Sequence, residues 1–192
     1  VTDDAESLYS EIAKEINADL IIMGSHGASG LKEFFTGSNT EKVIRYAEIP
    51  VLILKNELND VDFSDIVFAT DFSEETIPAF NKMLDSLDFL GAKKHLLFVN
   101  SPNEQFKTTP EMDALANNFL MKAEGHTNRL VNVNFVCAKS IEDGILDFSN
   151  AVGADLIALI THGRKGLSHV FSGSISEDVS NHSALPIMTF KI

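Results

Sequence analysis

Two glycine-rich segments of the sequence have the residue types and spacing of a phosphate-binding loop. The first begins at Gly24, has a second glycine at Gly27, and after nine further residues reaches Gly37-Ser38. Glycine lets the backbone approach a ligand closely, because no Cβ stands in the way. A helix that begins near Gly37-Ser38 offers free N–H groups and the positive end of its dipole to an anion. The spacing therefore predicts a cradle for a phosphate group, with the Ser38 hydroxyl as an added donor.

The second segment keeps most of this pattern. Its matching residues are Gly163, Gly173 and Ser174, but Ile160 occupies the position that Gly24 has in the first segment. A branched side chain there crowds the space that a glycine leaves open, so we expect weaker binding at this segment. A plain turn between a strand and a helix is the alternative for both segments. Neither segment has the Gly-Lys-Ser/Thr of a Walker A loop or the Gly-x-Gly-x-x-Gly dinucleotide fingerprint.

An internal repeat organises the chain, since residues 1–56 align without a gap with residues 137–192. Self-similarity of this kind indicates two copies of one structural unit. The second copy is complete, whereas nothing that matches 65–136 stands before the first. We therefore expect a C-terminal piece of a longer tandem protein. The expected division is 1–57 as the C-terminal half of a first unit, 58–64 as a linker, and 65–192 as a complete second unit.

The complete unit alternates apolar strands with amphipathic helices. Strands are expected at 66–70, 95–100, 133–137, 156–160 and 187–191, and helices at about 74–90, 111–131, 141–152 and 174–183. The first copy supplies a helix at 4–17, a strand at 20–23, a helix at 38–47 and a strand at 51–55. Ser73 and Ser140 are expected to cap helices, and Gly91 and Gly153 to end them. This order predicts an α/β fold with a doubly wound, five-stranded parallel sheet.

Composition excludes several classes of protein. The 192 residues include 28 acidic and 15 basic ones, a net charge of −13, which disfavours nucleic acid as the main ligand. No apolar run reaches the roughly 18 residues that cross a membrane, and no signal peptide is recognised. The single cysteine, Cys137, forms no intrachain disulfide or multi-cysteine metal site. We expect it in the core of a cytoplasmic protein, and we expect His26 and His162 to be structural.

Taken together, these features resemble the universal stress protein family. Its nucleotide-binding members carry G-x2-G-x9-G-(S/T), which the first segment matches in full, and the sequences ATDFS at 69–73 and PIMTF at 186–190 strengthen the likeness. The resemblance implies an adenine-nucleotide alpha-hydrolase-like fold and a site for ATP or AMP, optionally with Mg²⁺, and no intrinsic metal. It places Asp71 near the adenosine and Val99 against the adenine.

The residues that the resemblance implies in nucleotide binding come from both copies. They are Met23, Gly24, Ser25, Gly27, Gly37, Ser38, Asn39, Thr70, Asp71, Val99, Gly163, Gly173, Ser174 and Ile175. For Asp71, a ribose contact or helix capping is favoured over a phosphoacceptor role, because no acidic residue lies beside it before Glu74. No catalytic residue is assigned, and any ATP hydrolysis is expected to be slow, since no general base or arginine finger is evident.

The resemblance implies a cytoplasmic module that binds ATP or AMP and senses or regulates a stress response. The alternative is a structural or dimerisation module of the same family without nucleotide. An ATP-consuming enzyme of a related fold is a third class, for which the sequence offers no substrate pocket. The expected partners are an adenine nucleotide and either a second copy or an intrachain pseudo-dimer, in which 51–54 pairs with 187–190; no nucleic acid or membrane is expected.

Overall fold

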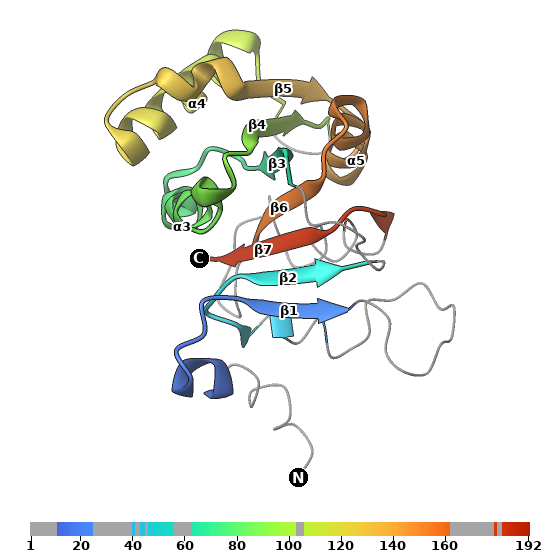
Figure 1. The fold of residues 1–192 in the computed structure, drawn as a ribbon. Helices are drawn as coiled ribbons and strands as arrows, with labels where there is room; N and C mark the ends of the chain where they lie inside the picture. The colour runs from blue at the N-terminus through green and yellow to red at the C-terminus, as the bar shows by residue number, and fades with distance from the viewer. Residues whose placement is uncertain are drawn as a thin grey trace.

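The computed structural model describes residues 11–24, 40, 43–44, 46–55, 63–102, 106–161, 179 and 182–192. Its strands form one sheet in the order β1-β2-β7-β6-β3-β4-β5 (Figure 1). The strands are β1 (Ile21–Gly24), β2 (Val51–Leu54), β3 (Asp65–Ala69), β4 (Lys93–Asn100), β5 (Val133–Cys137), β6 (Leu156–Thr161) and β7 (Ile187–Lys191).

The five strands of the complete unit are parallel to one another, as the sequence predicts. β3 pairs with β4 and with β6, β4 pairs with β5, and β6 pairs with β7, all in parallel. The bounds of β5 and β7 agree with the expected ones, and those of β3, β4 and β6 differ by one or two residues. The chain winds from β3 to β5 on one side and continues at β6 on the other, which is the doubly wound order.

Helices cover both faces of this sheet (Figure 1). On one face α3 (Ile77–Leu87) and α4 (Thr109–Glu124) pack over a large apolar cluster, and on the other α5 (Ile141–Val152) packs over a second. Short 3₁₀ turns precede and follow α3, at Glu74–Thr76 and Asp88–Leu90. A third 3₁₀ turn, Asn128–Asn132, leads into β5.

Local capping explains where these helices begin and end. The hydroxyl of Ser140 accepts a hydrogen bond from the N–H of Asp143 at 3.0 Å, which confirms its predicted N-cap role. Gly91 and Gly153 take left-handed conformations at the predicted ends. The expected helix over 111–131 is wrong at its C-terminal end: α4 stops at Glu124, because Gly125 has a φ of +73° and turns the chain.

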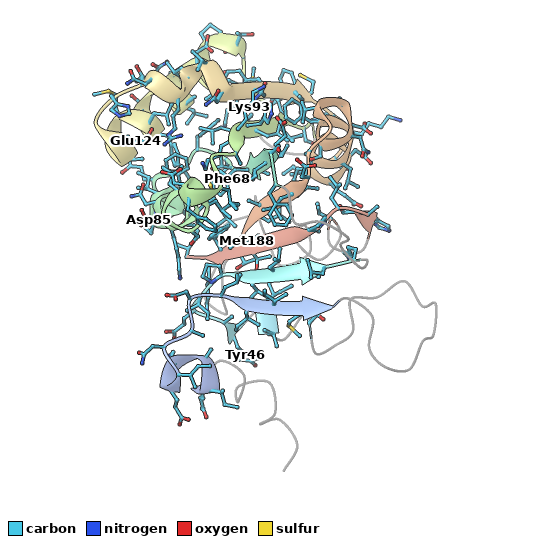
Figure 2. All side chains as sticks on the ribbon, in the orientation of Figure 1. Tyr46, Phe68, Asp85, Lys93, Glu124 and Met188 are labelled. Carbon is cyan, nitrogen blue, oxygen red and sulfur yellow. The ribbon has the colours of Figure 1, made fainter. Side chains whose placement is uncertain are left out.

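Each face of the sheet has its own core, because side chains alternate along every strand. The α3/α4 face buries Phe68, Phe80 and Phe119, and Figure 2 shows Phe68 between the sheet and the helices. The α5 face buries Val67, Leu97 and Ile157 with residues of α5. β6 is buried along its whole length, as expected for a strand covered on both faces.

An antiparallel pair of strands joins the N-terminal strands β1 and β2 to the rest of the sheet. β2 pairs with β7 so that Leu52 lies opposite Met188, which confirms the expected pairing of 51–54 with this strand. The core of the α5 face runs through the junction, since it contains Ile53 of the first copy beside Ile187 of the second. The Nζ of Lys82 on α3 also donates to the carbonyl of Glu48. Residues 46–55 therefore share one continuous sheet with the described residues of 63–192, and the core of the α5 face extends across the β2–β7 pair.

The outer strands of the sheet leave some side chains uncovered. Among the described residues β1 pairs only with β2, and its Ile22 is 60% exposed. Cys137 ends β5 at the opposite edge and is exposed. The expectation that Cys137 lies in the core is therefore wrong. β5 has no strand outside it in the described part of the chain to cover its last residue.

Candidate functional site

The candidate site of the complete unit lies at the ends of two neighbouring strands, β3 and β6, after which the chain continues to opposite sides of the sheet. β3 and β6 are adjacent and parallel, but the chain runs from β3 to β4 on one side and from β6 to β7 on the other. Their carboxyl ends meet at the same edge of the sheet. In open α/β sheets, ligands bind in the crevice outside the strand ends at such a point. Residues that directly follow β3, β4 and β6 are therefore the candidates for contact with a ligand.

Asp71 lies in the turn that follows β3 and is half-buried. One of its carboxylate oxygens, Oδ1, accepts a hydrogen bond from the N–H of Ser73 at 2.9 Å. Its other oxygen, Oδ2, has no hydrogen-bond partner among the described residues. The side chain thus caps the turn that leads into the 3₁₀ helix at Glu74–Thr76, which agrees with the capping role that the sequence favoured.

Ser73 was expected to cap this helix, and that expectation is wrong. Its side chain makes no capping hydrogen bond. The Oγ atom of Ser73 is buried and has no partner among the described residues. The neighbouring Asp71 carboxylate instead satisfies the backbone of the turn, because its oxygen reaches the N–H two residues on.

Thr70 stabilises the same turn from within. It is 1% exposed, and its N–H donates to the carbonyl of Leu97 at 3.0 Å. Its Oγ1 accepts from the N–H of Phe72 at 3.1 Å and lies 3.4 Å from the Oγ1 of Thr76. The hydroxyl of Thr70 is therefore engaged inside the protein, where it fixes the backbone on either side of Asp71.

Val99 lies near the end of β4, on the strand next to β3, and is half-buried. It packs on the α5 face of the sheet. A Cβ placed on Gly144 of α5 would lie 2.5 and 2.9 Å from the two methyl groups of Val99 and 3.1 Å from the Cβ of Ala138. Only glycine permits this approach of helix to strand. The position of Val99 therefore depends on residue 144 being a glycine, which has no Cβ.

The segment after β4 is held by two buried polar residues that the sequence analysis did not single out. Asn100 donates through Nδ2 to the carbonyl of Lys107 at 2.8 Å and accepts from the Lys107 N–H at 3.0 Å. The hydroxyl of Ser101 donates to the carbonyl of Lys139 at 3.1 Å. Asn100 and Ser101 are each 2% exposed. Their signal in the sequence is a pair of polar residues directly after the apolar run at 96–99.

Ile160, which replaces the first glycine of the loop motif in the second copy, lies inside the core. It is 0% exposed and belongs to the apolar cluster of the α3/α4 face, with Phe68 and Phe190. Its backbone pairs in register with Phe190 of β7. The side chain is therefore part of the packing between strands and helices.

The structure brings together three of the predicted binding residues and separates two others from them. Thr70, Asp71 and Val99 follow or end adjacent strands. Met23 and Gly24 lie at the end of β1, the outermost strand at the far side of the sheet. Because β2 runs antiparallel to β7, the carboxyl ends of the strands in the two copies point in opposite directions. The other predicted residues lie outside the described residues: Ser25, Gly27, Gly37, Ser38, Asn39, Gly163, Gly173, Ser174 and Ile175, as do His26 and His162.

Neither a metal-binding cluster nor a membrane-crossing helix occurs in the described part of the chain. No group of three or more histidine, cysteine or acidic side chains there could hold a metal ion. Within the same residues, no helix combines the length and the apolar character that crossing a membrane requires. The site as described therefore consists of one carboxylate, one half-buried valine and a braced turn.

Comparison with known proteins adds to this geometry. Residues 1–55 and 62–191 match the universal stress protein family. A Staphylococcus aureus (strain USA300) protein that carries this family's name is 37% identical over 65 residues, which cover 34% of this chain and 39% of the relative. The chain thus spans less than half the length of the curated relatives it matches.

Solved structures share the fold over nearly the whole chain. The crystal structure of a universal stress protein from Archaeoglobus fulgidus DSM 4304 has a TM-score of 0.63 and 25% identity, and the match covers 94% of this chain and 64% of that one. A functionally unknown protein from Pseudomonas aeruginosa PAO1 has a TM-score of 0.72 and 17% identity, over 99% and 69% of the two chains. With its sequence match, repeat and doubly wound sheet, this chain belongs to the universal stress protein family.

Proposed function

We propose that this protein binds an adenine nucleotide, AMP or ATP, and acts as a sensor or regulatory module in a stress response. The observation that carries the proposal is the Asp71 carboxylate. It stands at the switch point of the sheet with one oxygen fixed by Ser73 and the other without a partner among the described residues. A carboxylate in this state is an acceptor ready for the hydroxyl groups of a ribose.

Two further features support an adenine nucleotide. Val99 offers a half-buried apolar side chain on the neighbouring strand, which suits the flat face of a base. The sequence of the first copy carries the complete Gly24, Gly27, Gly37, Ser38 motif, whose backbone N–H groups suit phosphate oxygens. Mg²⁺ would enter with the phosphates of ATP. The protein part of the site would then bind and orient the nucleotide, and the bound state would be the signal.

Titration calorimetry with AMP and with ATP tests the proposal. We expect Asp71→Ala to weaken binding by about tenfold or more, the loss typical of a hydrogen bond to a charged group. Asp85→Ala is the matched control, because Asp85 is exposed on α3 and its removal changes the net charge equally (Figure 2). It should change the affinity less than twofold. Equal effects of the two variants would contradict the role of Asp71.

The second candidate function is a structural or dimerisation module without nucleotide. It is favoured by the antiparallel pairing of β2 with β7 and by Ile160, which fills the core at the position of a motif glycine. Absence of heat with both nucleotides at high protein concentration would support this module and contradict the binding proposal.

A further inference from the structure

The turn that carries Asp71 contains a backbone conformation that its sequence disfavours. Phe72 has a φ of +57°, in the left-handed region, although it is neither glycine nor asparagine. A bulky residue there is a genuine outlier. Such conformations are energetically costly and persist only where the surrounding structure holds them. The contacts of Phe72 should therefore show what holds this turn.

The ring of Phe72 is fixed by other aromatic rings from three elements. Phe72 is 3% exposed. Its ring stacks on Phe98 of β4 at a centroid distance of 6.1 Å, with 8° between the planes. It meets Phe119 of α4 edge-on at 5.3 Å and Phe135 of β5 edge-on at 6.5 Å. Aromatic pairs in these geometries are favourable beyond their buried area, so the ring anchors residue 72 on the α3/α4 face.

The left-handed conformation has a direct effect on the carboxylate. It turns the chain so that the N–H of Ser73 points back to Oδ1 of Asp71 at 2.9 Å. The N–H of Phe72 itself is satisfied by Oγ1 of Thr70 at 3.1 Å. A turn closed by an Asp side chain with a positive φ at the next residue fixes the carboxylate relative to the strand. The packing of the Phe72 ring therefore fixes the conformation of the turn, and the turn fixes the Asp71 carboxylate.

We propose that Phe72 is the positioning residue for the Asp71 carboxylate. Its ring, held by Phe98, Phe119 and Phe135, keeps the backbone left-handed, and this fixes one Asp71 oxygen on Ser73 while the other faces the ligand. The inference rests on the proposed nucleotide binding for its functional consequence, but its structural part stands without any ligand. Because Phe72 is 3% exposed, its proposed effect on the ligand passes through Asp71.

A first experiment uses the ligand-free chain and reads hydrogen exchange at the amide of Ser73. Phe72→Leu keeps an apolar side chain but loses the ring contacts, and should speed exchange of this amide by about tenfold or more. Phe80→Leu is the matched control: Phe80 is 0% exposed and contacts Phe68 and Phe119 within the same cluster. It should leave the Ser73 amide protected. Unchanged protection in Phe72→Leu would overturn the inference.

A second variant covers the case in which Phe72→Leu does not fold. Phe135→Leu leaves residue 72 in place and removes one ring from its anchor at the sheet edge. It should speed exchange at Ser73 relative to Phe80→Leu, in the same direction and by a smaller factor. Exchange as slow as in the unaltered chain would count against the anchor.

A second experiment measures AMP affinity in a double-mutant cycle with Asp71→Ala. Phe72→Leu should weaken AMP binding by about tenfold or more in the unaltered chain and cause no further loss once Asp71 is alanine. An equal further loss in that background would overturn the inference, because Phe72 would then act by another route. If the unaltered chain binds neither AMP nor ATP, the proposed function fails, while the exchange experiment still decides the role of Phe72.

Discussion

Alanine at position 144 tests how closely α5 approaches β4 behind Val99. The added Cβ would lie 2.5 and 2.9 Å from the Val99 methyl groups, closer than real Cβ atoms come to their neighbours. Val99 is β-branched, so its χ1 angle is stiff and the methyl groups do not turn aside easily. Overpacking of this kind costs typically about 1–3 kcal/mol. Alanine returns about 1 kcal/mol in a helix interior relative to glycine.

The net expectation is that Gly144→Ala lowers the free energy of unfolding by about 1 kcal/mol, from the difference of these two effects. The sign should reverse in a Val99→Ala background, because both clashing methyl groups are then absent. There, Gly144→Ala should stabilise the protein by up to about 1 kcal/mol, the helix-propensity gain alone. The cycle therefore has a coupling free energy of about 1–3 kcal/mol, well above the usual error of additivity.

Urea unfolding followed by circular dichroism measures all four members of the cycle. Equal m values are required, so that the midpoints report stability. Ala151→Gly calibrates the propensity effect, because Ala151 is exposed on α5. The reasoning is refuted if Gly144→Ala is as stable as the unaltered chain while Ala151→Gly shows the normal loss. It is equally refuted if the two substitutions of the cycle are additive.

Three further outcomes follow from the same structure. Ile160→Gly should restore the loop motif and strengthen nucleotide binding at the second copy, as measured by calorimetry; unchanged affinity would contradict the steric argument. The same substitution should lower the free energy of unfolding in urea by about 3–5 kcal/mol, because a fully buried side chain is lost. Ile53→Ala should lower the free energy of unfolding by about 2–5 kcal/mol, because Ile53 is 0% exposed at the β2–β7 junction. Ile22→Ala at the exposed β1 should change it by no more than about 0.5 kcal/mol, and similar losses in the two variants would refute a shared core. Hydrogen bonds from the Thr108 N–H and hydroxyl lower the pKa of Glu111, so the contribution of Glu111 to stability is complete above the ordinary pKa of 4.5 and is lost as the pH falls through the lowered pKa. Glu111→Gln should therefore flatten the acid limb of the curve of stability against pH, and an unchanged limb would contradict this.

Much of the fold was predictable because it depends on local patterns. Apolar runs located the strands of the complete unit, and β5 and β7 were predicted at their observed bounds. Gly91 and Gly153 marked helix ends because glycine alone takes the left-handed conformation without steric cost. The error in the predicted C-terminal end of α4 also concerns a left-handed glycine. Gly125 is also a left-handed stop, but the helix was predicted from the apolar residues before it, and its expected range of 111–131 ran past this glycine.

Only part of the candidate site could be predicted. Asp71 and Val99 were named from the resemblance to the universal stress protein family, and the sheet brings them to adjacent strand ends. The buried Asn100 and Ser101 were missed, because their partners, the backbone of Lys107 and of Lys139, are defined only by the folded loops. Cys137 was misplaced, since exposure of a strand residue depends on whether another strand lies beside it.

The positions of most strands and helices, and the family of the chain, follow from the amino-acid sequence alone, because these rest on local spacing and on motifs. Tertiary structure alone decided that Phe72 is left-handed and that glycine is required at 144. Neither has a local signal: phenylalanine disfavours a positive φ, and a glycine inside a helix is locally unfavourable. Both are fixed by contacts between residues far apart in the sequence, Phe72 with Phe119 and Gly144 with Val99, which exist only once strands and helices have packed.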